Sequence, residues 1–170
     1  IGSAEIRIAS TTRSAASLLA HAHVDVDYVL TADADDNPEA DGSTTGSDAA
    51  VTIVYLETEA RTVVSGSANL QVTGDVTLKA ETDANVNATA DGGTEGNNVG
   101  ATLALTIVDL TTEASITDTA TVNATGADAD IVVQAIEDAT VTTAATSTAG
   151  GADENGGGNR SQDRLDNPDG

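Results

Sequence analysis

Along most of the chain, apolar side chains occur at every second position with polar side chains between them. Such alternation is typical of β-strands that bury one face. The apolar members of the clearest runs are Val24, Val26, Tyr28 and Leu30; Leu70 and Val72; Val76, Leu78 and Ala80; Ala84, Val86, Ala88 and Ala90; and Ile131, Val133 and Ala135. Turns that contain glycine, at residues 73–75 and 125–127, separate some of these runs. The pattern predicts an all-β protein of short strands.

The chain also repeats itself at an offset of about 54 residues. Residues 52–60 recur as residues 106–114, and Thr73-Gly74 recurs as Thr125-Gly126 at a shorter offset. A weaker match relates residues 5–8 to residues 75–78. Offsets that change at turns are typical of stacked structural units.

The repeats divide the chain into four parts. We expect a partial repeat at 1–50 with an acidic insertion at 32–48, full repeats at 51–98 and 99–149, and a loop rich in Gly and Asp at 150–170. Because the pattern begins and stops within a repeat, we expect an excerpt of a longer protein or a subunit of a filament.

The side chains available for a core are small. The 170 residues include no Phe, Trp, Met or Cys and only two Tyr. A β-sandwich core usually draws on large aromatic side chains, whereas the narrow interior of a solenoid is filled by ladders of small aliphatic residues and Thr. We therefore predict a parallel β-helix, or β-solenoid, with polar loop insertions and roughly two coils in each repeat. A β-sandwich is the alternative.

Charge excludes several classes of function. The chain has 28 Asp and Glu against 6 Lys and Arg, for a formal net charge of −22. Such a chain lacks the basic surface that nucleic acids require. No apolar run approaches the roughly 20 residues of a membrane-spanning helix. The absence of Cys excludes disulfides and thiolate metal sites.

Residues 99–105, 112–116, 120–124 and 130–135 resemble the repeats of large bacterial filamentous surface adhesins of the filamentous haemagglutinin type. The resemblance covers residues 51–149 and, weakly, residues 5–9. It implies a right-handed parallel β-helix in a secreted or surface-anchored rod. It supplies no catalytic residues.

The acidic insertion contains the best candidate for a metal site. Oxygen-bearing side chains alternate there as in the first half of a calcium-binding loop. They are Asp33, Asp35, Asn37, Glu39 and Asp41. Pro38 and Thr44 depart from the EF-hand pattern, which has Gly and Glu at those positions. Calcium is the one cofactor expected, and a solvated acidic loop is the alternative.

Other constellations carry less chemistry. His21 and His23 would share one face of a strand and could chelate zinc with a third ligand, although a polar outer face explains them equally. The pairs Asp25/Asp27 and Glu57/Glu59 have the spacing of carboxylates on one face, which a polysaccharide-active β-helix enzyme could use. We expect no catalytic residues.

The function expected from the sequence is a structural and adhesive β-solenoid segment of an extracellular or cell-surface filament. It is not expected to be an enzyme. Its expected partners are other coils, through self-association or stacking, and a cell-surface or carbohydrate receptor. The alternatives are a calcium-dependent binding module, an ice-binding solenoid with a Thr117/Thr119/Thr121 row, and, with less support, the polysaccharide-active enzyme.

Overall fold

The computed structural model describes residues 2–9, 12–34, 47–92 and 99–147. These residues form nine strands and no helix. The strands are β1 (Gly2–Ala9), β2 (Thr12–Ala15), β3 (Leu18–Ala34), β4 (Ser47–Ser65), β5 (Asn69–Val72), β6 (Val76–Gly92), β7 (Val99–Ile116), β8 (Thr121–Ala124) and β9 (Ile131–Ser147). Within these ranges no helix could cross a membrane.

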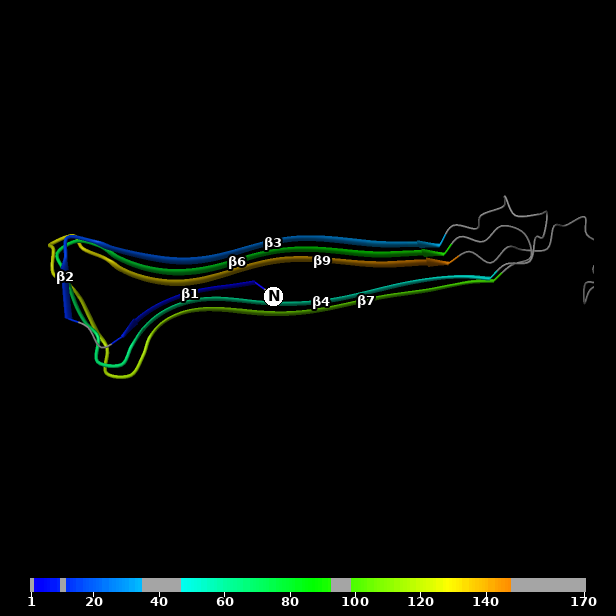
Figure 1. Ribbon diagram of the computed structural model, residues 1–170. Helices are drawn as coiled ribbons and strands as arrows, with labels where there is room; N and C mark the ends of the chain where they lie inside the picture. Colours follow the sequence, from blue (N-terminus) through cyan, green and yellow to red (C-terminus); the bar gives the residue numbers. More distant parts are fainter. Residues whose placement is uncertain (1, 10–11, 35–46, 93–98, 148–170) are drawn as a thin grey trace, which may run out of the picture. The chain divides into compact units, whose positions relative to one another are not determined.

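The strands form three parallel sheets, each of three strands, in the orders β1-β4-β7, β2-β5-β8 and β3-β6-β9. Every third strand along the chain therefore joins the same sheet, and Figure 1 shows β3, β6 and β9 running side by side. Three successive strands make one coil, so the first coil is β1-β2-β3, the second β4-β5-β6 and the third β7-β8-β9. The predicted parallel β-solenoid is confirmed.

The coils are larger than the sequence predicts. The strands β3, β4, β6, β7 and β9 have 17 to 19 residues, β1 has eight, and β2, β5 and β8 have four each. Paired residues of neighbouring coils are 56 apart between β1 and β4 (Gly2 and Thr58) and 52 apart between β5 and β8 (Asn69 and Thr121). One repeat therefore makes one coil, and the expectation of two coils is wrong.

The weak match between residues 5–8 and residues 75–78 is also wrong as a structural alignment. Glu5 lies in β1 and pairs with Arg61 of β4, whereas residues 76–78 lie in β6, which belongs to another sheet. Both segments alternate polar and aliphatic residues, which any half-buried strand of this chain does.

The register of β4 against β7 differs from the sequence repeat by two residues. Arg61 contacts Glu113, 52 residues later, and the Thr117 N–H donates to the Val64 carbonyl at 2.8 Å. The sequence match instead aligns residues 52–60 with residues 106–114, at an offset of 54 residues. A shift of two keeps every side chain on its own face, so the core pattern survives it.

A stacked turn sets this register. Gly66 and Asp118 both adopt positive φ, 65° and 60°, and the Gly66 N–H donates to Asp118 Oδ2 at 2.9 Å. The Thr119 hydroxyl donates to the Gly66 carbonyl at 2.8 Å. These bonds hold the turn of the third coil on that of the second, 52 residues apart.

By its internal contacts the chain divides into two units. The first comprises residues 1–30, 54–88 and 105–143, and the second residues 31–53, 89–104 and 144–170. In the second unit, the Thr52 hydroxyl donates to the Thr89 carbonyl at 2.8 Å, and Gly92 leaves room for Thr102. The first unit holds most of the core.

Alternate residues of the second coil are buried, as the period of two predicts. In β6, the buried positions begin Val76, Leu78, Ala80, Thr82 and Ala84. They pack in clusters with inward residues of β4 and β5, such as Val64 and Leu70. The buried apolar side chains of this interior are Ala, Val and Leu, with no aromatic residue among them.

Two glycines allow the turns after β5 and β8 to stack. A Cβ at Gly74 would lie 2.6 Å from the Ala16 carbonyl oxygen, and a Cβ at Gly126 would lie 2.3 Å from the Thr73 carbonyl oxygen. Each turn therefore approaches the backbone of the preceding coil more closely than any side chain permits. This contact explains why the Thr-Gly pair recurs in the sequence.

We predict that Gly126→Ala lowers the free energy of unfolding by about 1 to 3 kcal/mol, because the added methyl group must displace backbone. Urea unfolding followed by circular dichroism measures the change. Asp128→Ala, an exposed position of the same turn, is the control and should change stability by less than about 0.5 kcal/mol. Equal stability of Gly126→Ala and wild type would contradict the stacked turn.

Candidate functional site

The strands of the third coil lie at the edges of their sheets. β7, β8 and β9 each have one neighbour among the described strands, whereas β4, β5 and β6 have two. A parallel edge strand presents backbone N–H and C=O groups that another strand can pair with. We call this surface, formed by β7, β8 and β9, the third-coil edge.

Side chains that would be buried in a longer stack are uncovered at the third-coil edge. Leu70 and Val72 of β5 are 3% and 2% exposed, whereas their partners Val122 and Ala124 of β8 are only half-buried. The contrast is larger in β9, where Ile131 and Val133 are 45% and 42% exposed. The third-coil edge therefore exposes apolar surface of the kind that stacking buries elsewhere.

Hydrogen bonds identify which β9 side chains face the interior. Where β5 and β8 pair, the Thr121 N–H donates to the carbonyl of Ala68, the residue before its partner Asn69. The Val76 N–H donates in the same way to the Asp130 carbonyl at 2.8 Å, so the partner of Val76 is the next residue, Ile131. Oγ1 of Thr143 lies 2.7 Å from Oγ1 of Thr106 in β7. The odd-numbered residues of β9 therefore face inward.

Glu137 is among these inward residues. Oγ1 of Thr112 lies 2.8 Å from Oγ1 of Thr82 and 3.3 Å from Oε2 of Glu137, so the Thr112 hydroxyl can accept from Thr82 while it donates to Glu137. Thr82 is fully buried, whereas Glu137 is exposed at the third-coil edge. A polar line thus crosses the core from β6 through β7 to β9.

One buried threonine has no hydrogen-bond partner among the residues that the structure describes. Thr58 is 2% exposed, and its hydroxyl makes no hydrogen bond with any described residue. By contrast, the Thr62 hydroxyl donates to the Lys79 carbonyl at 2.7 Å. Burying a hydroxyl without a partner costs about 1 to 3 kcal/mol.

We predict that Thr58→Val raises the free energy of unfolding by about 1 kcal/mol, because it removes the unpaired hydroxyl and keeps the branched shape. Thr62→Val is the matched control and should lower stability by about 1 kcal/mol, because it removes a made bond. Chemical denaturation of both variants gives the comparison. The same sign for both would mean that the hydroxyl of Thr58 is paired.

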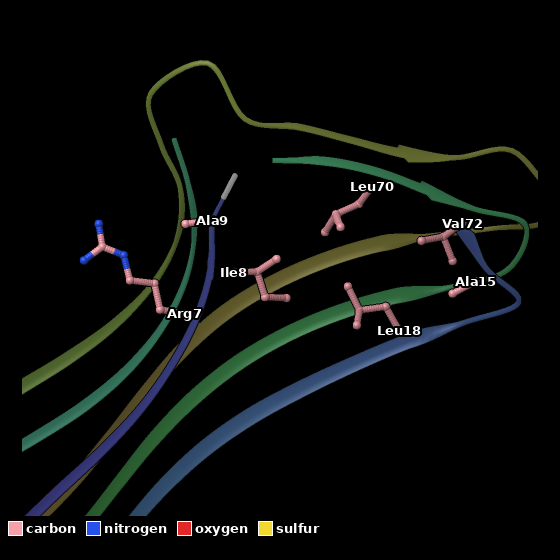
Figure 2. A pocket seen from close by; sticks show the side chains of 7 residues that line it. All are labelled: Arg7, Ile8, Ala9, Ala15, Leu18, Leu70 and Val72. Atoms are coloured by element: carbon pink, nitrogen blue, oxygen red, sulfur yellow. The ribbon is translucent and has the colours of Figure 1, made fainter. Parts of the chain in front are cut away.

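A pocket of about 410 Å³ lies between the first coil and β5. Figure 2 shows Ile8, Leu18, Leu70 and Val72 pointing toward one another, while the guanidinium of Arg7 points away. Ala9 and Ala15 complete the lining. The first coil, like the third, is an edge of every sheet, so apolar surface is accessible at both edges of the described stack.

The outer face of β3 and β6 carries a network of histidines and carboxylates. His21 Nε2 lies 3.0 Å from Glu81 Oε2, and His23 Nε2 lies 3.0 Å from Asp83 Oδ2. The two imidazole rings stack with centroids 5.8 Å apart, and Lys79 also donates to Glu81. Hydrogen bonding from Lys79, aided by His21, lowers the pKa of Glu81.

Each histidine therefore pairs with its own carboxylate across the sheet. Among the described residues no group of three or more His, Asp and Glu has the arrangement of a metal site. The network joins the first coil to the second as alternating charges do on a β-sheet surface. A structural role explains His21 and His23 within the described residues.

A second network lies on the outer face of β4 and β7. Arg61 donates from Nη2 to Glu113 Oε2 at 2.7 Å and from Nη1 to Glu59 at 3.1 Å, and the Ser115 hydroxyl donates to Glu113 at 2.7 Å. The bonds from Ser115 and then from Arg61 lower the pKa of Glu113. The same contact with Glu113 raises the pKa of Arg61.

We predict that Glu113→Gln is less stable than wild type at neutral pH and that the difference shrinks as the pH falls below about 4.5. The folded pKa of Glu113 is lowered, so its contribution is present above the unfolded pKa and is lost on protonation. Unfolding free energies of wild type and Glu113→Gln, measured between about pH 3 and about pH 7, give the difference in stability as a function of pH.

Glu57→Gln is the control for this prediction, because Glu57 is exposed and makes no ion pair among the described residues. It should be no less stable than wild type at neutral pH. A difference between Glu113→Gln and wild type that does not change with pH would show that the Arg61 pair contributes nothing.

The candidate calcium ligands lie mostly outside the described residues. Asp35, Asn37, Glu39 and Asp41 fall in 35–46, which the structure does not describe. Asp33 is an exposed residue near the end of β3. The calcium loop therefore stays a prediction.

The structure places the other candidate residues on the outer faces. Asp25 and Asp27 line a groove of about 260 Å³ together with Asp83 and Asp138, and Asn85 donates to Asp27 at 3.3 Å. Glu57 and Glu59 line a separate groove of about 220 Å³ on β4. Their use in catalysis stays untested.

The row of threonines proposed for ice binding is not one flat strand. Thr117 and Thr119 flank the turn residue Asp118, and Thr121 begins β8. The Thr119 hydroxyl is used within the fold, in its bond to Gly66. Thr117, Thr119 and Thr121 therefore form no regular array, and ice binding stays a prediction.

Sequence reasoning missed Glu137. The signal was present, because the offset of 55 that relates Asp83 to Asp138 also relates the buried Thr82 to Glu137. A carboxylate in the third coil thus takes the position that a buried, uncharged residue has in the second coil.

Comparisons with protein family models, with curated proteins and with solved structures find no match to this chain.

Proposed function

We propose that this chain is a structural segment of an extracellular or cell-surface filament built from stacked β-solenoid coils. Its role is to extend the filament and to make it stiff. The third-coil edge is the surface onto which a further coil stacks. The supporting observation is the contrast between Leu70 and Val72, which coils on both sides bury, and the half-buried Val122 and Ala124 in the same sheet.

The stacking of coils supports stiffness. Each sheet links successive coils by backbone hydrogen bonds, and the bonds from Arg61 to Glu113 and between His21 and Glu81 add links on the outer faces. In arrays of this kind stability is a sum of contributions from each unit and each contact between neighbours. Each added coil therefore extends the rod and stabilises the one before it.

The charge distribution suits a filament in water. The net charge of −22 keeps separate rods apart, and the carboxylates at Asp25, Asp83 and Asp138 lie on an outer face. The resemblance of residues 51–149 to filamentous haemagglutinin-type repeats supports the placement at the cell surface and a right-handed winding.

We predict that the chain associates end to end at high protein concentration in about 1 M NaCl, where the Debye length is about 3 Å and repulsion between chains is screened. Val133→Asp should abolish this association, because it puts a charge on the inward face of the third-coil edge. Sedimentation velocity measures the distribution of species.

Val132→Asp is the matched control. Val132 has the same side chain and nearly the same exposure, 43% against 42% for Val133, but as an even-numbered residue it lies on the outer face of β9. It should associate like wild type. Equal losses of association in both variants would refute stacking through this edge.

A further inference from the structure

The position of Glu137 in the stack follows from the registers of β3, β6 and β9. The Leu18 N–H donates to the Asp75 carbonyl at 3.0 Å, which places Leu18 beside Val76, and the same count along both strands places Val24 beside Thr82. The bond between Asn85 and Asp27 agrees with this spacing. Glu137 lies beside Thr82 on the other side.

Val24, Thr82 and Glu137 therefore occupy equivalent inward positions in the first, second and third coils, and we call such a set of equivalent positions a rung. Val24 is 7% exposed and Thr82 is fully buried. The inward neighbours of Glu137 in β9 are Ala135 and Ala139. Among the described residues the Thr112 hydroxyl donates to the carboxylate of Glu137, and no Lys, Arg or His forms an ion pair with it.

A coil that stacks on the third-coil edge would remove Glu137 from water. In a second copy of this chain, the first coil offers Val24 at that rung, which can neither donate a hydrogen bond nor carry a compensating charge. A buried carboxylate without such a partner is strongly unfavourable. Within the chain, the residue beside Val24 in the next coil is Thr82, and both of these side chains are buried.

We infer that Glu137 is a specificity-determining residue of the third-coil edge, which disfavours stacking of a second copy through its first coil and favours an incoming coil with a hydrogen-bond donor or a cation at this rung. The inference rests on the proposed function, since it assumes that a coil stacks on this edge. It adds the chemistry that the incoming coil must have.

The test compares the dissociation constant for end-to-end association of wild type and Glu137→Thr in about 1 M NaCl by sedimentation velocity. Glu137→Thr recreates the Thr82–Val24 pair at the junction between two copies. We expect at least about a tenfold tighter association than for wild type. Glu137→Gln, a neutral side chain of the same shape, is the second variant and should also associate more tightly.

Asp138→Thr is the matched control, because Asp138 is the next residue and lies on the outer face, where it lines the groove with Asp83. It removes the same charge without touching the interior. Its dissociation constant should stay within about twofold of that of wild type, since salt screens exposed charges. Circular dichroism and thermal unfolding establish that each variant is folded.

The outcomes separate the inference from the proposed function. If wild type, Glu137→Thr and Glu137→Gln associate equally while Val133→Asp does not associate, stacking stands and the role of Glu137 is wrong. If Asp138→Thr tightens association as much as Glu137→Thr, overall charge and not the core position decides, and the role is again wrong. If no variant associates, both the stacking and the role of Glu137 are refuted.

Discussion

The structure depends on the stacking of each coil on its neighbours in parallel register. A coil of this chain has too few large side chains to bury its own interior, so its apolar residues are covered mainly by the coils on either side. Leu78 and Val86 of the second coil are fully buried, while Ile131 and Val133 of the third are not, although all four face inward. Burial in this fold is thus a property of position in the stack.

Polar groups are arranged around the same constraint. Carboxylates on the outer faces meet cations or histidines of the neighbouring strand, as Glu113 meets Arg61 and Asp83 meets His23. Threonines supply the polar groups inside, where Thr62 bonds to a backbone carbonyl and Thr82 to Thr112. Glu137 combines the two patterns, because it is a charged group with an inward direction, and this is why the third-coil edge differs from a simple continuation of the core.

The sequence predicted the fold class but not the size of the coil. The period of two and the small side chains indicated a parallel solenoid, because both follow directly from the geometry of a thin core. The strands were expected to be short because Glu81-Thr82-Asp83 interrupts the apolar series, whereas Thr82 is buried and β6 continues through it. Glu137 was missed for a related reason, since the direction of a polar residue depends on register, which bonds such as that between Thr112 and Glu137 reveal. The candidate calcium ligands beyond Asp33 lie outside the described residues.

The shift of two residues between the repeat and the register of β4 and β7 bears on how such a chain can change in length. Because side chains alternate between faces, gain or loss of an even number of residues in a long strand leaves inside and outside unchanged, whereas an odd number exchanges them. Turns that are held separately, as Gly66 and Asp118 hold theirs, then restore the alignment downstream. Insertions and deletions in pairs are therefore the tolerated steps by which coils of unequal length can arise from one ancestral repeat.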